Sequence, residues 1–251
     1  MCRHIAYLGP RLALGELLVR PAHGLVRQSW APRRQRHGTV NADGFGVGWY
    51  ADGDPVPARY RRSVPIWADP SFPDLARVVR TGAFLAAVRD ATQASADGEA
   101  AAAPFAFGPW LFSHNGAAKG WPGSLAPLTA SLPAVELLSL EARCDAALLW
   151  ALVSRRLRNG DEPGQALGDT VTEVAEAAPG SRLNFLLTDG AVIAATSWGD
   201  SLWYRTGPRQ SIAVASEPYD DDPHWFEVPD RTLLVATRAD VLLSPLKERP
   251  S

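Results

Sequence analysis

The order of secondary-structure signals most constrains how this chain can fold. Strand patterns come first, two amphipathic helix patterns follow at Asp145–Leu157 and Gln165–Ala177, and strand patterns return in the last third. There, Asp189-Gly190 is a strong hairpin signal between the expected strands Arg182–Leu187 and Val192–Trp198. This order predicts an α+β protein with two sheets and helices packed outside them. Because no repeat or linker divides the 251 residues, we expect a single domain spanning residues 2–251.

Composition excludes several classes of function. The net charge of −2 gives no basic footprint for nucleic acid, and no run of about 20 apolar residues could cross a membrane. Two cysteines, Cys2 and Cys144, do not make a disulfide framework and are expected to be reduced thiols in a cytoplasmic protein. No Cys/His spacing typical of zinc sites occurs, so we expect no metal. The oligomeric state is left open, and a homo-oligomer is compatible with the sequence.

The residue after the initiator methionine is a cysteine, and its small side chain favours removal of Met1. A mature chain beginning at Cys2 would carry a thiol and a free α-amine. Such an amine titrates near ~7.7–8.0, so it can accept a proton at neutral pH, and a thiolate is a strong nucleophile. One residue would then supply both the nucleophile and its base. Taken alone, Cys2 is better interpreted as an incidental residue near a chain end, and only the motifs that follow favour the nucleophile.

Three further motifs accompany Cys2 along the chain. A glycine-rich strand entry covers Asp43 to Trp49, Arg89 and Thr92 follow an apolar strand pattern, and His114-Asn115-Gly116 follows another. In this order the motifs resemble the class II glutamine amidotransferases, which belong to the N-terminal-nucleophile (Ntn) hydrolases. The resemblance implies a four-layer αββα sandwich of two mainly antiparallel sheets between helices, with an N-terminal cysteine nucleophile.

One branch of that family is more similar still, namely the amidohydrolases of ergothioneine biosynthesis. The similar stretches are Met1 to His4, Ala31 to Gln35, Asn41 to Gly48, Ala103 to Phe105, Phe112 to Gly116 and Ala215 to Pro218. The resemblance implies hydrolysis of the γ-glutamyl amide of γ-glutamyl-hercynylcysteine sulfoxide through a glutamyl thioester, with a small-molecule substrate and no cofactor. Two alternatives stay open: a glutaminase or other γ-glutamyl amide hydrolase, and a non-catalytic γ-glutamyl-binding domain.

The resemblance assigns catalytic roles to Cys2, Asn115 and Gly116. Cys2 would attack the γ-carbonyl, while the Asn115 side-chain amide and the Gly116 backbone N–H would hold the oxyanion. Glycine lets the backbone approach closely and adopt unusual dihedral angles. The competing interpretation of Asn115-Gly116 is an ordinary turn, the commonest meaning of that dipeptide.

The resemblance likewise assigns the glutamate half of the substrate to Arg89, Thr92 and Asp145. Arg89 ends an apolar run, where an unpaired charge would be costly and a guanidinium fork could bind a carboxylate. Its alternative is a structural salt bridge. Asp145 would hold the substrate ammonium, although aspartate at a helix start is also a routine cap.

Supporting roles fall to Asp43, expected to fix the loop behind the nucleophile, and to His114, expected to be a scaffold residue near the site. His4 has no assigned role, because the α-amine makes a Cys–His dyad unnecessary. Cys144 is expected to be a small buried core residue.

Groups that could read the leaving half are harder to predict. Aromatic faces bind quaternary ammonium groups, but most tryptophans are simply core residues. The basic run Arg33–Arg36 could meet a substrate carboxylate, or it could be a solvated face. Candidate aromatic residues are Trp30, Trp49, Tyr50, Trp67, Trp121 and Tyr219.

Overall fold

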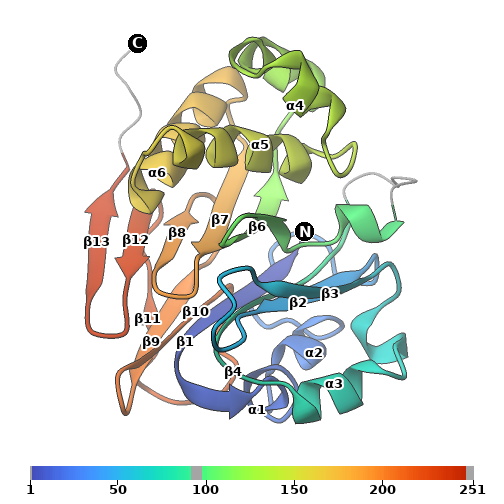
Figure 1. The fold of residues 1–251 in the computed structure, drawn as a ribbon, viewed down its shortest axis with the longest axis vertical. Coiled ribbons are helices and arrows are strands. Elements are labelled where there is room, and N and C mark those ends of the chain that lie inside the picture. The colour runs from blue at the N-terminus through green and yellow to red at the C-terminus, as the bar shows by residue number, and fades with distance from the viewer. Residues whose placement is uncertain (1, 92–97, 247–251) are drawn as a thin grey trace.

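A computed structural model describes residues 2–91 and 98–246 of the chain. Two sheets lie face to face, with helices on the outer face of each (Figure 1). This is the αββα sandwich expected from the sequence. No helix in the described part of the chain is long and apolar enough to span a membrane.

The first sheet has seven strands in the order β11-β9-β10-β1-β4-β2-β3, and all the pairings are antiparallel. Its centre is the pairing of β1 with β4, in which Arg3 lies opposite Val88. Cys2 therefore directly precedes a central strand and lies next to the C-terminal end of β4, which Arg89 follows. The strands are β1 (Arg3–Ala13), β2 (Phe45–Trp49), β3 (Ala58–Arg62), β4 (Arg80–Val88), β9 (Trp203–Gly207), β10 (Ser211–Ala215) and β11 (Phe226–Glu227).

The second sheet has six strands in the order β13-β12-β8-β7-β6-β5. At its core, β6 pairs with β7 over seven positions, from Leu111 opposite Thr188 to Ala117 opposite Arg182. The hairpin expected at Asp189-Gly190 joins β7 to β8, and Asp189 Oδ1 accepts backbone N–H groups of Ala191 and Val192. The strands are β5 (Phe105–Phe107), β6 (Trp110–Ala117), β7 (Arg182–Thr188), β8 (Ile193–Ser197), β12 (Thr232–Ala236) and β13 (Val241–Pro245).

Helices cover the two outer faces. Short helices α1 (Gly15–Leu18), α2 (Leu25–Gln28) and α3 (Phe72–Val78) pack on the first sheet. The longer α5 (Asp145–Arg158) and α6 (Pro163–Ala177) pack on the second. Burial of their apolar faces stabilises these layers. The remaining short helices are α4 (Ala134–Leu138) and the 3₁₀ segments Ile66–Ala68, Gly98–Ala101 and Gly123–Ser131.

Side-chain alternation along β1 explains how one strand serves two cores. Ile5 and Tyr7 face the outer helices, whereas Ala6 and Leu8 belong to the cluster between the sheets. The glycines of β2 permit close packing: a Cβ on Gly46 would lie 2.4 Å from the Ala103 carbonyl oxygen. The glycine-rich motif therefore allows close approach inside the sandwich, and it leads into strand β2 and not into a helix N-terminus.

Two local predictions were wrong. Gly9-Pro10 is typical of a turn, but β1 continues through it with a register shift between Leu8 and Leu12. The sequence from Leu12 to Arg20 predicts a short helix stopped by Pro21, but only the single turn α1 forms, with β1 reaching Ala13. The alternative interpretation of Asn115-Gly116 as a turn does not apply, since both residues are paired within β6. Strands β5, β11 and β13 were not predicted.

Candidate active site

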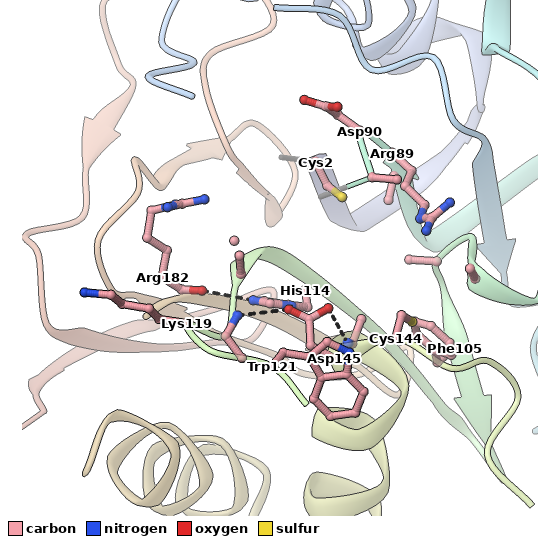
Figure 2. A pocket seen from close by; sticks show the side chains of 18 of the residues that line it. Cys2, Arg89, Asp90, Phe105, His114, Lys119, Trp121, Cys144, Asp145 and Arg182 are labelled. Atoms are coloured by element: carbon pink, nitrogen blue, oxygen red, sulfur yellow. Dashed lines mark hydrogen bonds and ion pairs between the residues drawn. The ribbon is translucent and has the colours of Figure 1, made fainter. Parts of the chain in front are cut away.

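A cavity of ≈ 860 Å³ opens where the two sheets and the start of α5 meet. Cys2 and the residues after β4 line it from the first sheet, while the end of β6 and the start of α5 line it from the second (Figure 2). Its size is within the range of about 300–1,000 Å³ found for small-molecule sites. Of the residues predicted for the site, Cys2, Arg89, His114, Gly116 and Asp145 line this cavity.

Cys2 connects the two sheets directly. Its backbone nitrogen donates a hydrogen bond to Asn115 Oδ1 at 3.1 Å, from the start of β1 to the end of β6. The residue is half-buried, and burial raises the pKa of its thiol. The thiol is therefore protonated at neutral pH, so nucleophilic attack requires a proton acceptor.

Only one end of the Asn115 side-chain amide, the oxygen, has a hydrogen-bond partner among the described residues. The residue is fully buried and its Oδ1 is bonded to Cys2, yet Nδ2 is buried with no hydrogen-bond partner among the residues described. An unpaired buried donor is costly and calls for an explanation. Gly116 beside it has a φ of 146°, and a Cβ there would lie 2.0 Å from the Arg182 carbonyl oxygen, so only glycine fits.

Arg89 and Asp43 hold each other at the end of β4. The Asp43 backbone N–H donates to the Arg89 carbonyl oxygen at 2.9 Å, and Arg89 Nη1 donates to the Asp43 carbonyl oxygen at 3.2 Å. Asp43 Oδ2 accepts the Ala91 N–H at 2.8 Å. Asp43 thus fixes the segment that follows β4, which carries Arg89 into the cavity. Thr92, expected beside Arg89, lies outside the described residues.

Asp145 is the first residue of α5, after the N-cap position at Cys144. Its Oδ2 accepts the Ala118 N–H at 2.9 Å, and its Oδ1 accepts the Ala146 N–H at 2.8 Å. The carboxylate also lines the cavity. The helix-terminal contact and a ligand-binding role are therefore compatible in one side chain.

His114 and His4 are both held by partners other than the Cys2 thiol. His114 Nε2 lies 3.0 Å from the Arg182 carbonyl oxygen, which only accepts, so Nε2 carries a proton. Its Nδ1 lies 3.9 Å from Asp145 Oδ2. His4 Nδ1 pairs with Ser113 Oγ at 3.2 Å, and burial, followed by Arg3 and His114, lowers the pKa of His4 to about 3.

Several cavity residues were missed by sequence reasoning, because nothing in their local sequence marks them. They include Lys119, Arg143 and Arg182. Cys144 was expected to be a core residue, but it is only partly buried and lines the same cavity as Cys2. Burial raises the pKa of its thiol to about 11, which disfavours the thiolate at neutral pH.

Most residues considered for binding the leaving half of the substrate do not line this cavity. Of the six aromatic candidates, Trp121 alone lines this cavity among the described residues. Arg33 and Arg34 line a separate cavity of ≈ 420 Å³, and their backbone N–H groups donate to the buried Glu217 carboxylate at 3.0 and 2.7 Å. Glu217 therefore tethers the basic run, an arrangement the sequence could not reveal.

Within the part of the chain that the structure describes, no group of three or more His, Cys, Asp or Glu residues could hold a metal ion. The functional side chains of the cavity are thiols, carboxylates and cations, and the Asn115 amide is bonded to the backbone of Cys2. Such a set suits acyl transfer from a charged substrate.

Comparisons with known proteins agree with this fold. Residues 23–208 match the family model of the class-II glutamine amidotransferases. A γ-glutamyl-hercynylcysteine sulfoxide hydrolase from Mycolicibacterium smegmatis is 42% identical over 98% of this chain and 100% of its own length. A glutamine aminotransferase class-II domain protein from Silicibacter pomeroyi has a similar structure, with a TM-score of 0.71 and 25% identity over 98% of this chain and 100% of its own. A glutamine phosphoribosylpyrophosphate amidotransferase from B. subtilis shares the fold at a TM-score of 0.67 and 15% identity, covering 99% of this chain and 50% of its own.

Proposed function

The chain belongs to the class II glutamine amidotransferase family, and we propose that it hydrolyses the γ-glutamyl amide bond of γ-glutamyl-hercynylcysteine sulfoxide. The products are glutamate and hercynylcysteine sulfoxide. Support for this substrate comes from the relative with 42% identity that is named for the same hydrolysis. A free thiol as the nucleophile fits a reducing compartment, and we place the reaction in the cytoplasm.

One observation carries the proposal of catalysis. The nitrogen of residue 2 is held 3.1 Å from Asn115 Oδ1, while Nδ2 of the same amide is buried without a partner among the described residues. An unpaired buried donor, in the side chain that binds the nitrogen of Cys2, is suited to a charge that exists only during reaction. This favours an enzyme over a non-catalytic γ-glutamyl-binding domain.

The chemistry then follows from the groups in the cavity. The Cys2 sulfur attacks the γ-carbonyl carbon, and the thiol proton passes to the α-amine exposed by removal of Met1. Asn115 Nδ2 and the Gly116 N–H hold the oxyanion. The leaving nitrogen takes the proton from the amine as the C–N bond breaks, leaving a glutamyl thioester. The amine then deprotonates a water molecule, which releases glutamate and regenerates the thiol.

The proton acceptor is best assigned to the α-amine because the histidines are poor candidates. His4 does not line the cavity, and its low pKa of about 3 makes it a weak base. His114 Nε2 is committed as a donor to the Arg182 carbonyl oxygen, and its Nδ1 is directed at Asp145 Oδ2, 3.9 Å away. The α-amine belongs to the same residue as the thiol, and its pKa is near neutrality in most proteins.

The glutamate half of the substrate needs a cation and an anion. Arg89 offers its guanidinium to the α-carboxylate, with Thr92 assigned beside it, and Asp145 offers its carboxylate to the α-ammonium. In Figure 2, Arg89 and Asp145 lie on different walls of the cavity, with Cys2 near Arg89. This arrangement would bind the α-carboxylate and the α-ammonium of glutamate from different sides while its side chain reaches the thiol.

The test is a product assay with purified protein. We expect glutamate release from γ-glutamyl-hercynylcysteine sulfoxide with a kcat/KM far above that for glutamine. High activity on glutamine and none on the sulfoxide would instead identify a glutaminase. Cys2→Ala should bind substrate without turnover, and intact-mass spectrometry should show that active protein lacks Met1. Full activity in protein that retains Met1 would refute the α-amine mechanism.

A further inference from the structure

Two cations occupy the side of the cavity away from Arg89. Figure 2 shows Lys119 and Arg182 on one side of His114 and Asp145, and Arg89 on the other. The proposed function assigns Arg89 to the α-carboxylate of glutamate and assigns nothing to these two. Their charges therefore face the part of the cavity that would receive the amine half of the substrate.

Lys119 is held by its backbone while its charge stays available. Its N–H donates to Ser181 Oγ at 2.9 Å, and its side chain runs over Gly180, where a Cβ would lie 3.5 Å from Nζ. The residue is exposed, and no carboxylate forms an ion pair with its ammonium in the described ranges. The backbone contact fixes where the side chain begins, and Lys119 lines the cavity.

Arg182 is oriented by a buried carboxylate. Its Nε lies 3.2 Å from Asp200 Oδ2, and the Asp200 side chain is only 2% exposed. The terminal guanidinium nitrogens have no hydrogen-bond partner among residues 2–91 and 98–246. Asp200 thus holds one edge of the guanidinium and leaves the two terminal nitrogens for a ligand.

The β6–β7 pairing brings these cations next to the reacting groups. Ala117 lies opposite Arg182 in the register, and the Arg182 carbonyl oxygen packs against Gly116, the proposed oxyanion donor. When the leaving amine is an amino acid, its carboxylate is only two bonds from the scissile nitrogen. A cation that emerges beside Gly116 is well placed to meet such a group.

Resting on the proposed function, we propose that Lys119 and Arg182 form a subsite for an anionic group carried by the amine half of the γ-glutamyl amide. The subsite makes the natural substrates γ-glutamyl derivatives of amino acids and explains how glutamine is disfavoured. Glutamine loses ammonia and leaves both cations without a partner.

The test measures binding and turnover of two probes that differ in one charge. The probes are γ-L-glutamyl-L-alanine and γ-L-glutamyl-L-alaninamide. Calorimetry on Cys2→Ala, which needs no turnover, should give a Kd about tenfold or more lower for the carboxylate probe, as charge-assisted hydrogen bonds imply. In the wild type, the ratio of kcat/KM values should follow the same order.

Variants of the subsite should reduce this preference. Lys119→Met should lower the ratio about three- to fivefold, because its ion pair with the ligand is exposed. Arg182→Gln could fail to fold by leaving Asp200 buried alone, so it is paired with Asp200→Asn. The double variant should lower the ratio about tenfold. Arg77→Gln removes an exposed charge on α3 and should keep the wild-type ratio.

Equal Kd values for the two probes, no binding of either probe, or a preference that survives in both subsite variants would overturn the subsite. If neither probe nor the sulfoxide releases glutamate, the proposed function is refuted. The subsite is judged separately, because the calorimetry on Cys2→Ala measures binding of the anion without turnover.

Discussion

Two asparagines that face each other across β6 and β7 should differ in how much stability and activity they lose when truncated to alanine. Asn115 and Asn184 are direct register partners, and both are fully buried. Asn184 is satisfied at both ends: Oδ1 accepts the Trp198 N–H at 2.9 Å, and Nδ2 donates to the Asp200 carbonyl oxygen at 2.9 Å. Asn115 uses Oδ1 alone, for the nitrogen of Cys2.

The difference in hydrogen bonding sets the expected changes in stability. Asn115→Ala loses one hydrogen bond of about 1 kcal/mol but removes an unpaired donor whose burial costs about 1–3 kcal/mol, so stability should change by less than about 1.5 kcal/mol. Asn184→Ala removes the acceptor of the buried Trp198 and Asp200 N–H groups and should cost about 2–4 kcal/mol. For Asn115→Ala, kcat should fall by about 10²–10³, the usual loss for one oxyanion donor.

The assay combines urea unfolding of both variants with steady-state glutamate release. The free energy of unfolding comes from linear extrapolation, and kcat is measured with saturating substrate. Two results would refute the reasoning. One is Asn115→Ala losing as much stability as Asn184→Ala, which would mean that Nδ2 is satisfied in the folded enzyme. The other is Asn115→Ala retaining wild-type kcat, which would remove the amide from the reaction.

Three further predictions follow from the site. Arg89→Lys should raise KM about tenfold with a smaller effect on kcat, because the point charge of an ammonium replaces the planar guanidinium; kinetics like those of the wild type would show that Arg89 does not bind the α-carboxylate. Gly116→Ala should lower the free energy of unfolding by at least about 1–3 kcal/mol and also lower kcat, since a φ of 146° is strained for alanine and its Cβ would collide with the Arg182 carbonyl oxygen; a variant of wild-type stability in urea unfolding would contradict this. Burial, then Arg3 and His114, lower the pKa of His4 from 6.5 to about 3, so the unfolded chain binds a proton in that window and the folded protein does not. The free energy of unfolding should therefore fall on acidification by up to about 1.4 kcal/mol per pH unit from this residue, and His4→Gln should flatten that slope; identical slopes would show that His4 titrates normally.

Elements with a strong internal period were predictable. The apolar faces of α5 and α6 and the Asp189-Gly190 hairpin are local signals, and the structure confirms them. Elements that depend on partners were not. Strand β1 continues through Gly9-Pro10 because a register shift accommodates the missing N–H of proline, and local sequence cannot show this. Strand β13 was missed because it is a short edge strand with exposed leucines.

The same distinction applies to the site. Three site residues lie at or near strand ends within recognisable motifs, namely Cys2, Arg89 and Asn115. The sequence therefore predicted that they belong to one site. Lys119 and Arg182 carry no motif and become neighbours of the cavity only through the β6–β7 register. Glu217 reaches the backbone of the basic run from a distant part of the chain. Such contacts depend on tertiary pairing, which one sequence does not specify at the level of single residues.

The reacting groups come from opposite halves of the sandwich, joined at the cavity by the bond from Cys2 to Asn115. The thickness of the apolar layer between the sheets therefore sets how far sulfur lies from the oxyanion donors. Small side chains such as Ala6 and Ala83 keep that layer thin. Enlarging one of them, well away from the substrate, would separate the nucleophile from its acceptor pocket, and turnover would decline in a protein that still folds with every reacting residue intact.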